Sequence, residues 1–112
     1  MAFTDQVHLD GDTATYQVNP AVKKYTLSDL NFKKTKLGNY ELTQSLNPMN
    51  AKANVQLKLS ISADLKQLKL AILTASGLKN VDIFKGDQFA EEREQYQFLM
   101  QNLIIRQVLT KN

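Results

Sequence analysis

The stretch that decides the fold is residues 87–110, DQFAEEREQYQFLMQNLIIRQVLT. It contains no Gly and no Pro, and good helix formers dominate it. Asp87 directly follows a Gly and is suited to cap the first free amides of a helix. Acidic residues lie near the start, and Arg106 and Lys111 lie near the end, which matches the helix macrodipole. The stretch therefore predicts one long C-terminal helix of roughly 35 Å, at about 1.5 Å per residue.

The apolar residues of this helix fall on two stripes. At about 100° per residue, five of them project within one narrow arc: Phe89, Tyr96, Met100, Leu103 and Ile104. A second stripe projects nearly opposite and consists of Phe98, Ile105 and Leu109. A helix that is apolar on two sides must be covered on both. Either the rest of the chain wraps around the helix, or a second chain covers the second stripe. We expect this second stripe to support a homodimer.

The residues before this helix predict short antiparallel strands. Residues 53–62 alternate apolar and polar side chains without error, as in a strand with one buried face. Residues 66–74 fit either a strand or a helix face, and the turn at Ala75-Ser76-Gly77 favours the strand. Residues 26–30 fit a short helical turn or a bend, and we favour a turn. The remaining predictions are strands at 3–9, 12–19, 31–36, 40–46 and 78–84, a two-residue hairpin turn at Asp10-Gly11, a tight turn at Leu37-Gly38-Asn39 and a loop at 47–50.

This order of elements predicts an α+β fold, with a curved antiparallel sheet of about six to seven strands packed on one long C-terminal helix. The length of 112 residues predicts a single domain over residues 1–112. With no Cys, the chain offers no disulfide, thiolate nucleophile or zinc knuckle. It shows no secretory signal and no apolar run near the ~18 residues of a membrane span, so we expect a cytoplasmic protein.

Few residues are candidates for catalysis or metal binding. His8 is the single His, and we interpret it as a solvent-facing strand residue, because one His without Cys is poor material for a transition-metal site. The cluster Glu91-Glu92-Arg93-Glu94 lies where a helix start favours negative charge, so we interpret it as solvated. None of the four Gly belongs to a phosphate-binding loop. We therefore predict no catalytic, cofactor-binding or metal-binding residue, and we expect no cofactor.

Positive charge concentrates in the middle of the chain. Residues 23–85 hold eleven Lys against four acidic residues. We expect an exposed sheet face, able to meet phosphates, that carries Lys34, Lys36, Lys58 and Lys69. Only two Arg occur and no aromatic platform accompanies these Lys, whereas nucleic-acid readers use Arg on base edges and aromatic rings for stacking. We favour a soluble outer face, and a nucleic-acid-binding face is the alternative.

The whole chain resembles one family. The features that carry the resemblance are the Asp10-Gly11 hairpin, the Lys-rich strand with its Leu37-Gly38-Asn39 turn, the alternating Val55–Ile61 stretch and the terminal helix. They are similar to a small, uncharacterised bacterial family labelled "putative amino acid metabolism". This resemblance implies a curved antiparallel sheet against a long helix, similar in outline to the TATA-binding-protein fold. It also implies a role in amino-acid metabolism, with a gene context that tends towards sulfur amino acids. It brings no known functional residues.

These observations lead to three hypotheses of different classes. The first is a non-catalytic cytoplasmic protein that works by binding, with a protein as its partner. The second is an RNA- or DNA-associated module that uses the Lys-rich face. The third, an enzyme or small-molecule binder with a pocket between sheet and helix, has the least support from the residues.

Overall fold

The computed structural model describes residues 3–9, 11–12, 14–47, 55–74, 76–77, 79–85 and 89–111. Within them, antiparallel sheets and a C-terminal helix confirm the α+β class. Predictions that concern Asp10, residues 48–50, Ala53, Asn54, Ala75, Leu78 and Asp87 lie outside the described residues. The elements in chain order are β1 (Tyr16–Val18), α1 (Lys24–Asp29), β2 (Lys33–Lys34), β3 (Tyr40–Ser45), β4 (Val55–Ile61), β5 (Leu68–Thr74), α2 (Ala90–Ile105) and β6 (Leu109–Lys111).

The larger sheet has four strands in the order β2-β3-β4-β5, all antiparallel. The alternation predicted for β4 is confirmed, because its apolar residues are buried and point to one side of the sheet. Leu68 to Thr74 pair with β4 along their whole length, so the strand interpretation of this stretch is also confirmed. The side chains buried on this inner face include Leu57, Leu59, Ile61, Leu68, Leu70 and Ile72.

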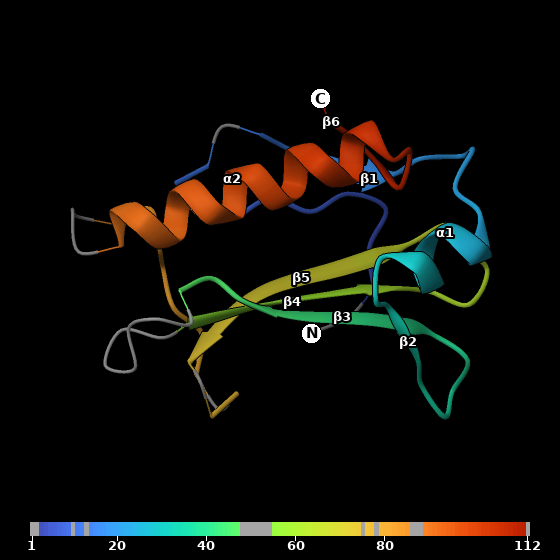
Figure 1. Ribbon diagram of the computed structural model, residues 1–112, viewed down its shortest axis with the longest axis horizontal. Coiled ribbons are helices and arrows are strands. Elements are labelled where there is room, and N and C mark those ends of the chain that lie inside the picture. Colours follow the sequence, from blue (N-terminus) through green and yellow to red (C-terminus); the bar gives the residue numbers. More distant parts are fainter. Residues whose placement is uncertain are drawn as a thin grey trace.

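Helix α2 runs along the inner face of the four-stranded sheet (Figure 1). Its buried side chains Tyr96, Met100 and Leu103 join those of β4 and β5 in one hydrophobic core. These residues belong to the first predicted stripe, and its contact with the sheet is confirmed. No helix among the described residues is long and apolar enough to cross a membrane.

The strands divide between two sheets, and the prediction of one curved sheet of six to seven strands is therefore wrong. The second sheet pairs β1 with β6 beside the C-terminal end of α2 (Figure 1). It forms because α2 ends at Ile105 rather than near residue 110, after which the chain turns and continues as a strand. With 16 residues, α2 is about 24 Å long rather than about 35 Å.

Gln107, two residues after the end of α2, reverses the chain. Its φ of 63° lies in the left-handed region, where Gly is usual after a helix. The N–H of Gln107 donates to the oxygen of Ile104 at 3.0 Å, and the N–H of Val108 donates to the oxygen of Leu103 at 2.9 Å. These two bonds form a Schellman motif. Because Gln is not the residue typical of this position, the sequence contained no signal for the end of the helix.

The N-terminal segment pairs with a different register from the one predicted. A two-residue turn at Asp10-Gly11 would place Val7 opposite Ala14. Instead Val7 and Tyr16 exchange backbone hydrogen bonds of 2.8 and 2.9 Å. The carboxylate of Asp12 accepts from the N–H of Ala14 at 3.1 Å, which adds a second bend before β1. Residues 3–9 consequently form isolated bridges rather than a regular strand.

Residues 24–29 form the short helix α1, whereas the favoured prediction for 26–30 was a turn and the helical reading was the alternative. Leu27 is fully buried, and this burial stabilises the helix although no side chain caps its start. The helix ends at Asp29, and Asn31, with a φ of 73°, then reverses the chain so that the N–H of Phe32 donates to the oxygen of Leu27 at 2.9 Å.

The tight turn at Leu37-Gly38-Asn39 is confirmed. Gly38 has a φ of 88°, and its N–H donates to the oxygen of Thr35 at 2.9 Å. A side chain at this φ would be strained, which explains the Gly. The strand before the turn, β2, has two residues, so the prediction of a strand over 31–36 was too long.

The strand predicted over 78–84 is absent from the described residues there. Asn80 forms an isolated bridge with Leu73, and the N–H of Val81 donates to the oxygen of Ile72 at 2.8 Å. The carboxylate of Asp82 then accepts from the N–H of Phe84 at 2.9 Å, and this local bond accompanies a turn in place of a strand.

Candidate functional site

The side of the four-stranded sheet that faces away from α2 carries mainly polar and charged side chains. Paired residues of adjacent antiparallel strands project to the same side. The register therefore places Lys33, Glu41, Ser60 and Lys69 in one row across the sheet, with Thr43, Lys58 and Ala71 in the next. We call these seven residues, together with Gln56 and Leu73, the outer sheet face.

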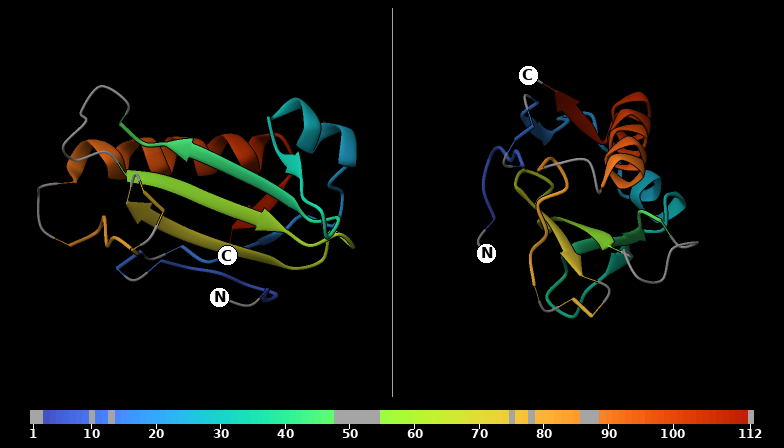
Figure 2. Two further views of the ribbon diagram at one scale, coloured as in Figure 1. Left: turned by 90° about the horizontal axis from the view of Figure 1, so that it is seen from below. Right: turned by 90° about the vertical axis from the view of Figure 1, so that its left-hand side faces the viewer.

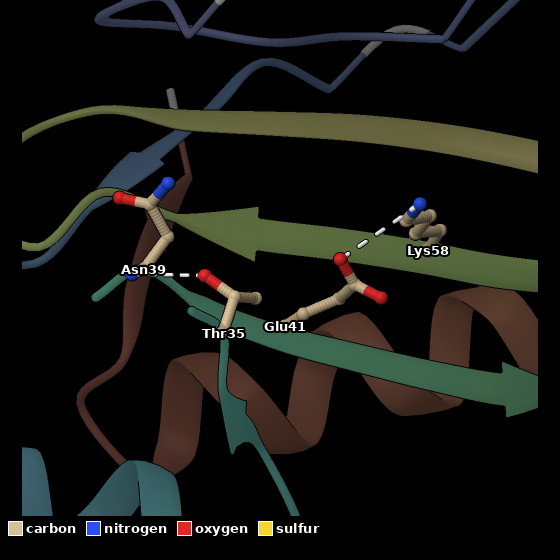
Figure 3. Close-up of polar contacts among 4 residues, drawn as sticks. All are labelled: Thr35, Asn39, Glu41 and Lys58. Atoms are coloured by element: carbon tan, nitrogen blue, oxygen red, sulfur yellow. Dashed lines mark hydrogen bonds and ion pairs between the residues drawn. The ribbon is translucent and has the colours of Figure 1, made fainter. Parts of the chain in front are cut away.

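Two of its Lys have defined partners. The Nζ of Lys58 lies 3.8 Å from the Oε2 of Glu41 on the neighbouring strand (Figure 3), and the two side chains are 43% and 36% exposed. An exposed pair of this kind contributes ~0.2–1 kcal/mol, so it is easily exchanged for another partner. The Nζ of Lys69 lies 4.6 Å from the ring centroid of Phe3, a cation–π contact. Backbone hydrogen bonds between Thr4 and Leu68 hold this N-terminal segment beside β5.

Ser60 lies at the floor of this surface. It is 3% exposed, although it projects away from the hydrophobic core. Two adjoining hollows of about 270 and 250 Å³ share Ser60 and Lys69 in their linings. The first also contains Lys58, and the second also contains Glu41. The small side chain between longer charged neighbours is what leaves this space open.

The structure brings together only some of the four Lys predicted to share a face. Lys58 and Lys69 project from the outer sheet face, and Lys36 lines the same hollow as Lys69. Lys34 pairs with Tyr40, whose side chain is buried on the inner side, so the register directs Lys34 to the opposite side. Its assignment to this face was wrong. Lys33 pairs with Glu41 and therefore lies on the outer sheet face instead of Lys34. Only the strand register shows which of these two adjacent Lys residues points outward.

The second apolar stripe of α2 is only partly a surface. Phe98 is 71% exposed and Ile105 is 66% exposed. Leu109 is fully buried in β6, beyond the end of the helix, and therefore cannot contribute to an exposed stripe. This corrects the set of three, because the early end of α2 turns Leu109 into the core. We call Phe98 and Ile105 the helix stripe.

The acidic start of α2 is not uniformly solvated. Glu91 and Glu94 are exposed, but Glu92 is 2% exposed, which corrects the prediction of a solvated cluster. The Nδ2 of Asn47 donates to Glu91 at 2.9 Å and to Glu92 at 3.3 Å. The other oxygen of Glu92, Oε2, is buried and has no hydrogen-bond partner in the part of the chain that the structure describes. Glu92 lies four residues before the buried Tyr96, on the same side of the helix, and this spacing could have indicated its burial.

His8 is exposed, as predicted. It lines a hollow of about 350 Å³ beside β5 together with Asn80, Asp82 and apolar residues. Among the described residues, no group of three or more His, Cys, Asp or Glu could hold a metal ion.

A buried tyrosine cluster was missed by the sequence analysis. The hydroxyl of Tyr96 donates to the carboxylate of Asp12 at 3.3 Å, and the Tyr96 ring meets Phe84 edge-on with centroids 5.8 Å apart. Burial, and after it the nearby Tyr16 and Asp12, raises the pKa of Tyr96. Burial and the Asp12 charge also raise the pKa of Tyr16. The cluster ties the N-terminal segment to α2, and its residues are too far apart in the sequence to form a motif.

The fold and this surface define a small α+β protein whose sheet is covered by a helix on one face and carries charged side chains on the other. The chain belongs to the DUF1831 family, since the family model described as "Putative amino acid metabolism" matches residues 1–110. It is similar to a DUF1831 family protein from Lactobacillus plantarum, known from a crystal structure. The two are 42% identical over 100% of this chain and 99% of that chain, with a TM-score of 0.90. A comparison with curated proteins found no match.

Proposed function

We propose that this protein is a non-catalytic, cytoplasmic accessory factor of amino-acid metabolism that works by binding protein, beginning with a second copy of itself. The metabolic setting is supported by the description of its family. The binding role is supported by one observation above all, the exposure of two large apolar side chains on the helix stripe. The likeness in outline to the TATA-binding-protein fold remains a prediction.

The helix stripe has the spacing of a contact surface. Phe98 and Ile105 are seven residues apart, close to two helical turns, so they project to the same side of α2. Leaving such side chains in water forgoes roughly 1.5–3 kcal/mol each relative to burial. Exposed apolar patches rimmed by polar residues commonly mark protein contacts. Twofold pairing of two α2 helices would cover both side chains of each copy.

The charges of α2 suit an antiparallel arrangement of the pair. Glu91 and Glu94 are exposed near the start of the helix, and Arg106 is exposed at its end. When two copies run antiparallel, the acidic end of one lies near the basic end of the other, and the two macrodipoles also oppose each other. Parallel pairing would bring like charges together.

Light scattering combined with circular dichroism tests self-association through Ile105→Glu. Because Ile105 is exposed within one chain, we expect this variant to keep the wild-type helical signal and to become monomeric. Gln97→Glu is the matched control, since it adds the same charge to the same helix at an exposed position off the stripe. A wild-type protein that stays monomeric at high micromolar concentration contradicts the proposal.

The second candidate function is nucleic-acid binding by the outer sheet face. It is favoured by the gathering of Lys36, Lys58 and Lys69 next to the aromatic ring of Phe3. It is opposed by Glu41, which lies on the same face and would repel phosphates. We expect weak binding of single-stranded RNA that fades as salt rises, with about −0.7 in log–log slope per phosphate contact. Tight binding at physiological salt, weakened by Lys58→Gln and Lys69→Gln, would establish this second function.

A further inference from the structure

We infer that the hollow over Ser60 on the outer sheet face binds a free α-amino acid with an apolar side chain, held as the zwitterion. This goes beyond the proposed self-association, because it uses another surface. The helix covers the inner face of the sheet (Figure 2), so the hollow and the helix stripe point away from each other and can be occupied together.

The hollow lies over one row of paired residues that crosses the sheet. Glu41, Ser60 and Lys69 stand opposite one another on β3, β4 and β5. Neighbouring strands lie about 4.8 Å apart, so the Cα atoms of Glu41 and Lys69 are separated by roughly 10 Å. Two long side chains of opposite charge thus flank a short hydroxyl. An α-amino acid carries its carboxylate and its ammonium group on one carbon, and it fits into such a gap with each group towards the opposite charge.

The charges on this row are available to a ligand. Lys69 contacts the Phe3 ring, and no carboxylate of a described residue forms an ion pair with it. It can therefore bind the carboxylate of the ligand, assisted by the hydroxyl of Ser60. Among the described residues, Glu41 forms an ion pair only with Lys58, at 3.8 Å and exposed, and an incoming ammonium group can replace it.

The same arrangement selects against other ligands of similar size. A dicarboxylate or a phosphate would meet Glu41, and a diamine would meet Lys58 and Lys69. Beyond the charged row, Phe3 and Leu37 supply apolar surface in one hollow, beside Thr35, Lys36 and Asn39. Leu73 and Ala71 supply it in the other hollow, beside Asn80. An aliphatic side chain placed there would cover Leu37, which is 86% exposed.

The test is a titration of the full chain with L-leucine, followed by amide NMR. We expect saturable shifts at Glu41, Ser60 and Lys69, with an affinity in the millimolar range because both hollows are open. Two comparison ligands isolate the two halves of the zwitterion. 4-Methylpentanoate lacks the amino group and 3-methylbutylamine lacks the carboxylate, and each should bind more weakly than L-leucine.

Single substitutions then test whether L-leucine binds at the row formed by Glu41, Ser60 and Lys69. Lys69→Gln and Glu41→Gln should each weaken L-leucine binding about two- to fivefold, the change that corresponds to one exposed ion pair. Lys24→Gln, which removes the same charge from α1, should leave binding unchanged. The inference is overturned if L-leucine causes no shifts on this face at millimolar concentration, if either comparison ligand binds as well, or if Lys69→Gln binds normally. Because the shifts are read residue by residue, a monomeric protein that binds L-leucine would refute the self-association and support this site.

Discussion

Replacing Glu92 by Met should make the protein more stable. The Glu92 carboxylate is 2% exposed, its Oε1 accepts one amide hydrogen bond at 3.3 Å, and its Oε2 has no hydrogen-bond partner among the described residues. A buried polar atom left without a hydrogen bond costs about 1–3 kcal/mol, and more when it is charged. Met has a similar helix propensity and an apolar side chain of similar length. Asn47 would keep its 2.9 Å bond to Glu91.

The expected increase in the free energy of unfolding is smaller than the full cost of the unpaired carboxylate oxygen. A negative charge in the first turn of a helix contributes about 0.3–1 kcal/mol, which the Met variant loses. We therefore expect the free energy of unfolding to rise by about 1–2 kcal/mol. With an m-value of about 1–3 kcal/mol per molar urea, the unfolding midpoint should rise by roughly 0.3–2 M.

Urea unfolding followed by circular dichroism measures this change. Glu94→Met is the matched control, because it removes the same charge from the same helix at an exposed position. The free energy of unfolding of Glu94→Met should stay within about 0.5 kcal/mol of the wild-type value. If Glu92→Met unfolds at lower urea while Glu94→Met does not, the carboxylate has partners in solution, and the reasoning from its burial is refuted.

Two further predictions concern the ends of the core. Leu109→Ala should lower the free energy of unfolding by about 2–5 kcal/mol. Ile105→Ala should change it little at protein concentrations too low for self-association, because Ile105 is exposed within one chain. Equal effects in urea titrations at such concentrations would contradict the difference in burial. Tyr96 and Tyr16 have raised pKa values, so the folded state resists their ionisation while the unfolded state ionises near 10.0. Stability should therefore be retained below that pH and fall as the pH rises above it, and the fall should be shallower in Tyr96→Phe. A pH series of urea midpoints that is unchanged by this substitution would show that Tyr96 is not the group responsible.

The outer sheet face shows what the alternation of residues along a strand can predict and what it cannot. Alternation along β4 and β5 correctly placed Lys58 and Lys69 away from the core, because burial of one side of a strand is visible as a period of two. Lys34 was misplaced, because its two-residue strand is too short to display any period. The side to which it points follows from pairing with Tyr40, a contact with another strand.

The sequence by itself determined the α+β class, the strand at 55–61, the left-handed Gly38 turn and the side of α2 that packs on the sheet. Each depends on local periodicity or on a residue whose backbone preference is strong. Only the tertiary structure decided that Leu109 leaves the helix to pair with Val18, and that the hydroxyl of Tyr96 meets Asp12. These two contacts join residues that are 91 and 84 positions apart in the chain. Their free energy comes from burial and hydrogen bonds that form only when both segments are in place, so no local pattern of residues contains it.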